Sequence, residues 1–166
     1  MKIALITGAS QGIGASIAKV LNKAKLKVIL VARSKKNLKK IQKNLIFPKY
    51  SKIISKDLRS LSACKSLNKK VKKINFLINV AGATKGGQFE KLSDKLWDDG
   101  FNLKFKSALR LSRIFWPTLK RNKGKIINIG GGAGAWEKPL RTFMIGGAVN
   151  AALNHFSKSL ALQGKI

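Results

Sequence analysis

The stretch TGASQGIG, residues 7–14, decides the fold of this chain. It follows a short apolar run, KIALIT at 2–7, and leads into a segment with helical spacing of apolar residues. Its three glycines permit a tight turn, and they leave the first helical N–H groups free for an anion such as a pyrophosphate. A purely structural turn is the alternative interpretation. The spacing is G-x-x-x-G-x-G, which differs from the common G-x-G-x-x-G fingerprint of dinucleotide sites.

Strand and helix patterns alternate along the whole chain. Short apolar runs typical of buried strands are each followed by a helical pattern, and they lie at 2–7, 26–32, 51–57, 74–82 and 124–132. Residues from about 92 to 119 and the stretch 141–161 have the pattern of long helices. This alternation predicts an α/β fold with a doubly wound parallel sheet and helices on both faces, in a single domain over residues 1–166. Ligands of such sheets bind at the carboxyl ends of the strands, where the strand order reverses.

The helical patterns also predict which side chains face the core. On the first helix these are Ile13, Ile17, Leu21 and Ala24. Ser34 is expected to cap the second helix, whose inward residues are Leu38, Ile41 and Leu45. On the third helix the apolar face comprises Leu61, Cys64, Leu67 and Val71.

The net charge of +29 is extreme and has two interpretations. It results from 29 lysines and six arginines against six carboxylates. The charge could serve a polyanion such as nucleic acid, or it could be compositional drift of a solvated surface. Base-reading and phosphate-gripping sites favour arginine, whereas here the lysines are spread from Lys2 to Lys165. Drift is therefore the favoured interpretation, and nucleic-acid binding is expected to be nonspecific.

Composition excludes several classes of site. One cysteine, Cys64, rules out an internal disulfide and a multi-thiolate metal site, and with one histidine and six carboxylates no metal site is expected. The start MKIALITGAS does not have the pattern of a signal peptide. No run approaches the roughly 18 apolar residues of a membrane span. A cytoplasmic protein without membrane association is the expectation.

Several motifs in order resemble the short-chain dehydrogenase/reductase family. TGASQGIG matches the family's TGxxxGxG loop, and NVAG at 79–82 resembles its NNAG, with Val80 in place of the second asparagine. FNLKFKSAL places Asn102 at the family's active-site asparagine. GKIINIGG matches the fifth strand, and NAALNHFSKSLA resembles the helix that follows the catalytic residues. The resemblance covers essentially the whole chain and implies a Rossmann-like fold.

The resemblance implies a dinucleotide site. The loop that holds the pyrophosphate would comprise Thr7, Gly8, Ser10, Gln11, Gly12, Ile13 and Gly14. Asp57 and Leu58 would border the adenine, and the ribose would be lined by Asn79, Ala81 and Gly82. At the end of the second strand, VARSKK offers Arg33 and Ser34 and no carboxylate. NADP(H) is therefore expected over NAD(H), because an arginine suits the 2′-phosphate; an ordinary surface charge is the alternative for Arg33.

The family's catalytic residues are largely absent. The resemblance implies hydride transfer with a tyrosine as acid/base, a lysine four residues later that lowers its pKa, and a serine that polarises the carbonyl. Only Asn102 remains as a catalytic candidate, because the corresponding positions hold Gly130 or Gly131, Gly146 and Asn150. Shifting the register puts Phe143 at the tyrosine position, and the single tyrosine, Tyr50, lies elsewhere in the chain.

Substitutes for these residues are few. The flanking residues Glu137, Lys138, Arg141 and Thr142, and a water held by Asn102 and Asn150, are candidates, although solvated loop positions are the favoured interpretation. His155 is expected to pack rather than to catalyse. The asparagines at 79, 102 and 150 have an equal alternative role, in satisfying buried backbone groups.

Three functions remain open. The first is an atypical NADP(H)-dependent oxidoreductase acting on an unidentified small molecule; the second is a non-catalytic nucleotide-binding protein; the third, based on charge alone, is a basic nucleic-acid-binding module. The family continues with further strands where this sequence stops, so a fragment of a longer reading frame is favoured over an edge covered by a partner chain. The resemblance also implies a homo-oligomer, paired through 101–120 and 147–162, which the basic residues of the first of these helices weaken.

Overall fold

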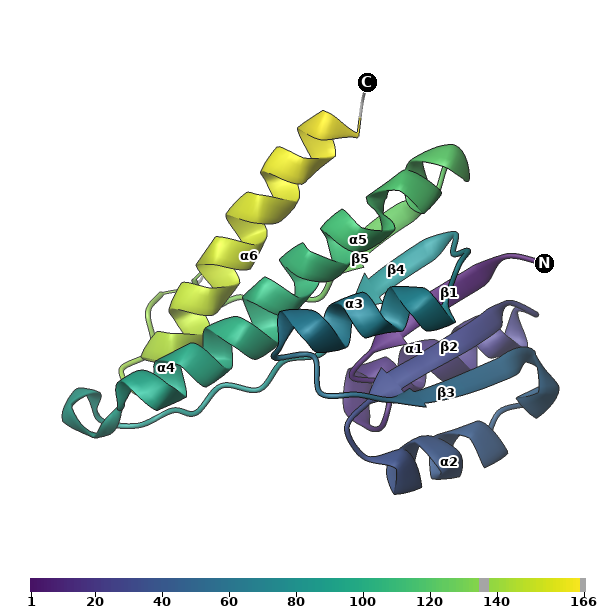
Figure 1. The fold of residues 1–166 in the computed structure, drawn as a ribbon. Helices are drawn as coiled ribbons and strands as arrows, with labels where there is room; N and C mark the ends of the chain where they lie inside the picture. Colours follow the sequence, from purple (N-terminus) through teal and green to yellow (C-terminus); the bar gives the residue numbers. More distant parts are fainter. Residues whose placement is uncertain (135–137, 165–166) are drawn as a thin grey trace.

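Five parallel strands form one twisted sheet in the computed structural model, which describes residues 1–134 and 138–164 (Figure 1). The strands are β1 (Ile3–Thr7), β2 (Lys27–Ala32), β3 (Ser51–Ser55), β4 (Phe76–Asn79) and β5 (Lys125–Asn128), in the order β3-β2-β1-β4-β5. The chain therefore leaves β1 for one edge of the sheet and returns to its other side at β4. The strand order reverses between β1 and β4, as the doubly wound prediction requires.

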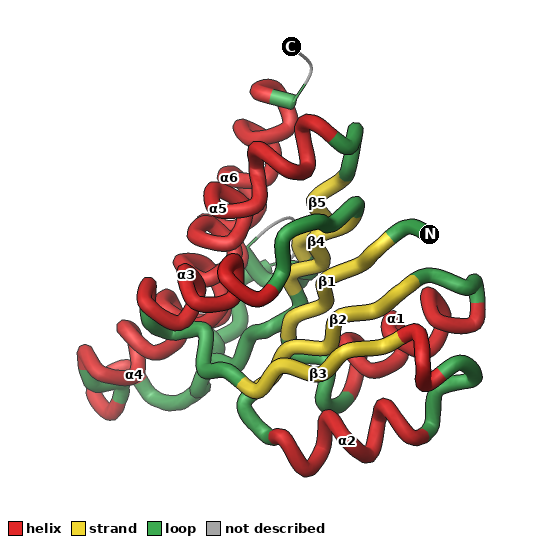
Figure 2. Tube along the Cα trace, turned by 45° about the vertical axis from the view of Figure 1, so that its right-hand side comes forward, coloured by secondary structure: helices red, strands yellow, loops and turns green. Residues whose placement is uncertain are grey.

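Helices cover both faces of this sheet. Figure 2 shows α1 (Gly12–Lys23) and α2 (Lys35–Lys43) on one side, with α3 (Leu61–Lys70), α5 (Ser107–Arg121) and α6 (Met144–Gln163) on the other. A short helix, α4 (Asp94–Gly100), continues through a π-helical segment, Phe101–Lys106, into α5. None of the helices within the described residues is both long and apolar enough to cross a membrane.

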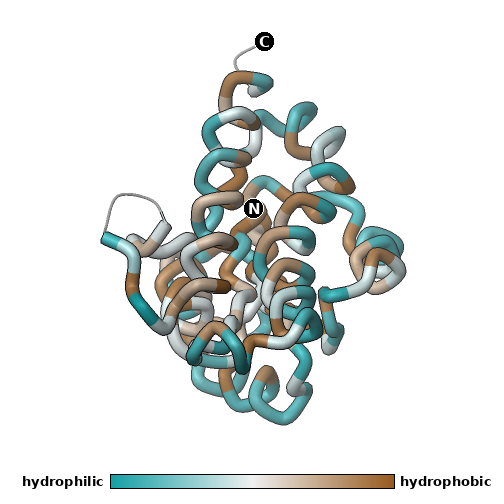
Figure 3. The backbone as a smooth tube through the Cα atoms, turned by 90° about the vertical axis from the view of Figure 1, so that its left-hand side faces the viewer, coloured by the Kyte–Doolittle hydropathy of each residue, from teal (hydrophilic) through white to brown (hydrophobic). Residues whose placement is uncertain are grey.

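Alternation along the strands divides the apolar side chains into two cores. On β1, Leu5 faces α3 and α5, whereas Ala4 and Ile6 face α1 and α2. All three are fully buried. The helices show short hydrophilic and hydrophobic stretches in turn (Figure 3), as expected where one face packs on a sheet.

Three of the predicted inward residues are exposed. Ile13, which the helical pattern placed inside, is 60% exposed, Leu61 is 45% exposed, and Ala24 is also exposed. Ile13 and Leu61 lie in the first turn of their helices, and Ala24 is the C-cap of α1, so all three are at helix ends rather than on the central face. The N-cap predicted for α2 is confirmed, because the Ser34 hydroxyl accepts a hydrogen bond from the Asn37 amide at 3.2 Å.

The thiol of Cys64 provides a probe of the larger core. It is fully buried and contacts the carbonyl oxygen of Leu58 at 3.5 Å. Burial raises the pKa of the Cys64 thiol, and the positive charge of Arg110 opposes this only in part. Burial therefore disfavours reaction of this thiol in two ways, because it blocks access and because the raised pKa disfavours the reactive thiolate.

We therefore expect an aromatic disulfide reagent to label the folded chain on the order of a hundredfold more slowly than the chain in denaturant, equivalent to a local opening of about 3 kcal/mol. The measurement is the rate of absorbance change at increasing urea concentration, and the single cysteine makes the signal unambiguous. Equal rates in the two states would show that the α3 side of the core is open.

Candidate active site

The hydroxyl of Thr7 joins the two strands at which the order reverses. Thr7 ends β1 and is 1% exposed. Its Oγ1 accepts hydrogen bonds from the backbone amides of Val80 and Ala81, at 2.9 and 3.0 Å, and lies 3.5 Å from the carbonyl oxygen of Ile78. These contacts hold the segment after β4 against the end of β1. The crevice expected of this fold is therefore anchored by a single side chain.

The glycine loop begins directly after Thr7 and is shaped by close backbone contacts. Gly8 and Gly12 have positive φ angles of 64° and 54°, which side chains other than hydrogen rarely adopt. A Cβ at Gly14 would meet the carbonyl oxygen of Gly8, and one at Gly8 would lie 3.0 Å from Ala81. Only glycine therefore permits this packing of α1 on the loop.

The N-terminus of α1 is open for an anion. Its N-cap residue, Gln11, makes no side-chain capping hydrogen bond, and no acidic residue lies in the first turn. No atom lies within 4 Å of where a Cβ of Gly12 would be, so the space above this glycine is free. Gln11, Gly12 and Ile13 are exposed, while Ser10 is half-buried. Free amides and the helix dipole together favour a negatively charged group here.

The end of β2 brings basic groups to the same side of the sheet. Arg33 is exposed, and its carbonyl oxygen accepts a hydrogen bond from the Ser55 hydroxyl at 2.6 Å. The hydroxyl of Ser34 serves as the cap of α2. A shallow depression on α2 is lined by Lys35, Lys36, Lys39, Lys40 and Lys43.

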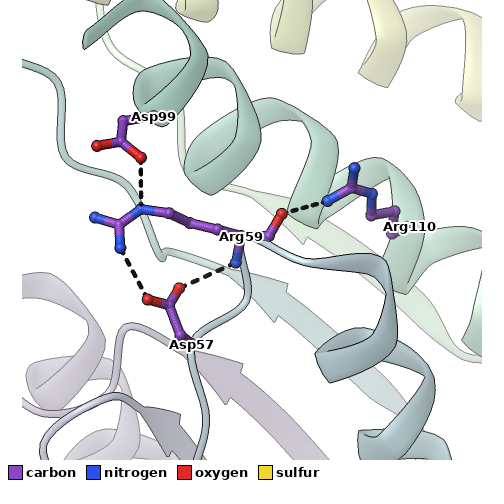
Figure 4. A network of polar contacts seen from close by, with 4 residues as sticks. All are labelled: Asp57, Arg59, Asp99 and Arg110. Atoms are coloured by element: carbon purple, nitrogen blue, oxygen red, sulfur yellow. Dashed lines mark hydrogen bonds and ion pairs between the residues drawn. The ribbon is translucent and has the colours of Figure 1, made fainter. Parts of the chain in front are cut away.

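At the end of β3, Asp57 is bound within the protein. Its carboxylate accepts a hydrogen bond from the Arg59 guanidinium at 2.8 Å and another from the Arg59 backbone amide at 3.1 Å. Arg59 also pairs with Asp99 of α4 at 3.3 Å, and its carbonyl oxygen accepts a hydrogen bond from Arg110 of α5 at 2.6 Å (Figure 4). Leu58 is 2% exposed and packs in the core. Leu58 thus offers almost no surface to a ligand, and of this pair it is the half-exposed Asp57 side chain that could make the predicted adenine contact.

At the end of β4, Asn79 links secondary-structure elements. It is 4% exposed, and its amide donates to the side-chain oxygen of Asn128 at 2.8 Å. Asn128 in turn donates to the Ser157 hydroxyl on α6 at 2.8 Å. Asn79 thus fastens β4 to β5 and α6, whereas Ala81 and Gly82 continue into the loop that borders the glycine loop.

A lysine that the sequence interpretation missed lies at the centre of this region. The Lys104 ammonium donates to the Asn150 side-chain oxygen at 2.6 Å and lies 3.5 Å from the Gly130 carbonyl oxygen. A Cβ at Gly82 would lie 2.9 Å from Cδ of Lys104, so the lysine side chain crosses this glycine. Desolvation by burial lowers the pKa of Lys104.

Asn150 is well placed to hold this ammonium group. It is 3% exposed, and its amide group donates to the Ala133 carbonyl oxygen at 2.9 Å, which leaves its oxygen directed to Lys104. Lys104 is in the π-helical segment, a rare backbone form that often occurs at functional sites. An apolar setting, FNLKF, around one lysine is the sequence signal that could have identified it.

Asn102 has no contact that supports the catalytic role predicted for it. It is half-buried, and within the described residues its side chain makes no hydrogen bond. Residues two apart on a helix point to different sides, so Asn102 and Lys104 do not share an environment. The structure brings Lys104, rather than Asn102, to Asn150.

No hydroxyl replaces the expected serine and tyrosine within the described residues of this region. A Cβ at Gly131 would lie 2.8 Å from Asn150 Nδ2, and a Cβ at Gly146 would overlap the Phe143 ring. The Phe143 ring therefore fills the space that a side chain at 146 would need.

The remaining candidates contribute little to the site. Lys138, Arg141 and Thr142 are exposed, and Glu137 lies outside the described residues. His155 is also exposed, so the packing role predicted for it is wrong. Nowhere in 1–134 or 138–164 do three His, Cys, Asp or Glu side chains gather as a metal site would require. A groove of about 510 Å³ lies between the last turns of α5, β5 and α6, and none of its lining residues belongs to the glycine loop.

Comparisons with known proteins agree with this geometry. The family model described as short chain dehydrogenase matches residues 2–165. An uncharacterized oxidoreductase of Staphylococcus epidermidis is 30% identical over 164 residues, covering 96% of this chain and 70% of that protein. The 3-oxoacyl-[acyl-carrier-protein] reductase of Escherichia coli is 32% identical over 170 residues, covering 96% of this chain and 66% of that enzyme.

Solved structures agree as well. A metagenomic short-chain oxidoreductase in complex with NADP superimposes with a TM-score of 0.89 at 28% identity, covering 98% of this chain and 75% of that one. This chain spans about two thirds of the length of the curated relatives it matches.

Replacing Thr7 tests the anchor between β1 and β4. Thr7→Val keeps the shape but leaves the amides of Val80 and Ala81 without their acceptor. We expect the free energy of unfolding to fall by about 1–3 kcal/mol, because buried donors are costly to leave unpaired. Urea denaturation measures the change, and Thr7→Ser, which keeps the hydroxyl, is the control. A Thr7→Val variant no less stable than Thr7→Ser would contradict the anchoring role.

Proposed function

The chain belongs to the short-chain dehydrogenase/reductase family, and on that premise we propose that it binds NADP(H) and transfers hydride between the nicotinamide and a carbonyl or alcohol. One observation carries the proposal: the glycine loop anchored by Thr7 at the switch point has an uncapped helix N-terminus and free space above Gly12. A dinucleotide pyrophosphate fits this cradle, because no side chain caps the first amides of α1.

Three segments at the carboxyl ends of the strands would each hold one part of the cofactor. The loop 7–14 would bind the pyrophosphate through its backbone amides. Asp57 would border the adenine beside the buried Leu58, and Ala81 and Gly82 would lie along the ribose of the nicotinamide. When bound, the cofactor supplies the hydride; the chain's own residues position it and handle the proton.

The basic end of β2 supports the phosphorylated cofactor. No carboxylate lies among residues 32–36 to bind a ribose 2′-hydroxyl or to repel a phosphate. Arg33 is exposed at this end of the sheet, followed by the N-terminus of α2 with its lysines. An arginine and a helix N-terminus both favour a 2′-phosphate. A structural neighbour has NADP bound.

A second candidate is a non-catalytic nucleotide-binding protein. The observation that favours it is the Phe143 ring over Gly146, together with Gly131 beside Asn150. These residues remove both hydroxyl positions that the family's usual reaction needs, while leaving the nucleotide cradle intact. Turnover separates this candidate from the first.

Calorimetric titration at physiological salt tests cofactor binding and preference. We expect one-site binding of NADPH that is tighter than binding of NADH. Arg33→Asp should weaken NADPH about tenfold to a hundredfold, the value of one lost charge-assisted contact, and should affect NADH far less.

Lys158→Asp is the matched control, since it makes the same charge change at an exposed position of α6. If both variants weaken NADPH equally, the effect is general electrostatics and the assignment of Arg33 is wrong. If neither nucleotide binds the folded native chain, the proposed function is wrong.

Oxidation of NADPH in the presence of a ketone tests the chemistry. Acetoacetyl-coenzyme A is the first probe, because a relative is named a 3-oxoacyl-[acyl-carrier-protein] reductase. We expect substrate-dependent loss of absorbance at 340 nm, and the Gly14→Ala variant, whose added Cβ collides with the Gly8 carbonyl, should lose it. Binding without turnover across a panel of ketones would favour the non-catalytic candidate.

A further inference from the structure

The Lys104 ammonium group lies where the carboxyl ends of β4 and β5 meet α6. Its alkyl chain crosses Gly82, which follows β4, and its Nζ lies near the Gly130 carbonyl, which follows β5. The 2.6 Å hydrogen bond to Asn150 fixes the amine from α6. Three segments that would border the nicotinamide under the proposed function thus converge on one cationic side chain.

The same pair of chemical groups that the resemblance implies is present, with the helices exchanged. The resemblance expects a lysine at position 150 and an asparagine on the preceding helix. The structure has Asn150 and, on the preceding helix, Lys104. The exchange keeps an amine and an amide in contact at this place, but the amine comes from the segment Phe101–Lys106 instead of from α6.

We propose that Lys104 is the proton donor for carbonyl reduction at this site, with Asn150 as its positioning residue. This inference rests on the proposed function, since it needs hydride from NADPH. As hydride adds to the carbonyl carbon, the C=O π bond breaks and its electron pair takes a proton from Nζ of Lys104. An O–H bond forms, an N–H bond breaks, and the product is the alcohol. The neutral amine then regains a proton from solvent.

The environment of Lys104 suits this role. Burial lowers its pKa toward the range in which a lysine can give up a proton. Lys104 is only half-buried, so water can restore the proton. Gly131 and Gly146 bring no hydroxyl to compete for the substrate oxygen.

Within residues 1–134 and 138–164, no carboxylate forms an ion pair with this amine. Desolvation is the one cause of the lowered pKa of Lys104, and the Asp99 carboxylate is paired with Arg59. The other charged side chains on this segment and on α4, α5 and α6, which pack against it, are Asp94, Lys95, Asp98, Lys106, Arg110, Arg113, Lys120, Arg121, His155 and Lys158, and Lys85 lies in the loop before α4.

Nuclear magnetic resonance of the full chain carrying lysine labelled with ¹³C at Cε tests where Lys104 lies relative to the nicotinamide. Lys104→Met identifies the signal by its loss, and Lys106→Met, an exposed neighbour, is the matched control. NADP⁺ and NADPH differ by the positive charge of the oxidised ring. We expect the Lys104 pKa to be lower with NADP⁺ than with NADPH by roughly one unit, with the Lys106 signal unaffected.

Two different failures are distinguishable. If calorimetry shows that both nucleotides bind and the Lys104 titration is the same with each, the inference is overturned and the proposed cofactor binding stands. If neither nucleotide binds, the proposed function itself is overturned, and the inference with it.

Kinetics with acetoacetyl-coenzyme A provide the second readout. Lys104→Met should lower kcat by about a hundredfold or more, the usual contribution of a general acid. The Kd for NADPH should change little, and Lys106→Met should keep the native kcat. A Lys104→Met chain that is folded, binds NADPH and retains its kcat would overturn the assignment.

Discussion

The acceptor capacity of one threonine hydroxyl underlies the arrangement of this molecule. A parallel sheet whose strand order reverses must leave two adjacent strand ends from which the chain departs in opposite directions. Here Thr7 closes that gap by accepting two amides from the segment after β4. Because Gly8 follows immediately and touches Ala81, the hydroxyl also sets the path of the glycine loop. The loop in turn fixes where α1 begins, and so where an anion can be held.

The two halves of the candidate site keep different shares of the residues that the family resemblance implies. On the nucleotide side, loop glycines, uncapped helix and basic strand end are all present. On the chemical side, the hydroxyl positions are glycines, and an aromatic ring occupies the space beside Gly146. What remains there is the pair of Lys104 and Asn150, in which the lysine ammonium donates a hydrogen bond to the asparagine oxygen. Nucleotide binding and proton transfer place separate demands on a protein, and the residues that the family resemblance implies for the first are present here.

Much of the fold could be predicted, since it depends on local patterns. Apolar runs located all five strands, and Ser34 marked the start of α2. The errors arose where tertiary context decides. Ile13, Leu61 and Ala24 had the right spacing but lie at the ends of their helices and are exposed. Lys104 was missed because motif matching stopped at Asn102, two residues earlier, and a π-helical segment changes which residues face the strand ends. The partners of Arg59 come from segments about 40 residues apart, which no local pattern reveals.

Arg59 connects the two halves of the site in a chain where carboxylates are scarce. It engages two of the six, Asp57 after β3 and Asp99 on α4, while its backbone is held by Arg110 on α5 (Figure 4). The helix that carries Asp99 runs directly into the segment of Lys104. A ligand that draws Asp57 away from Arg59 would therefore alter the restraint on that helix. By thermodynamic linkage the effect is reciprocal: a ligand that repositions the helix would change the affinity for a ligand at Asp57 by the same factor. Under the proposed function, the Arg59 guanidinium would couple cofactor binding to the position of the segment that carries Lys104.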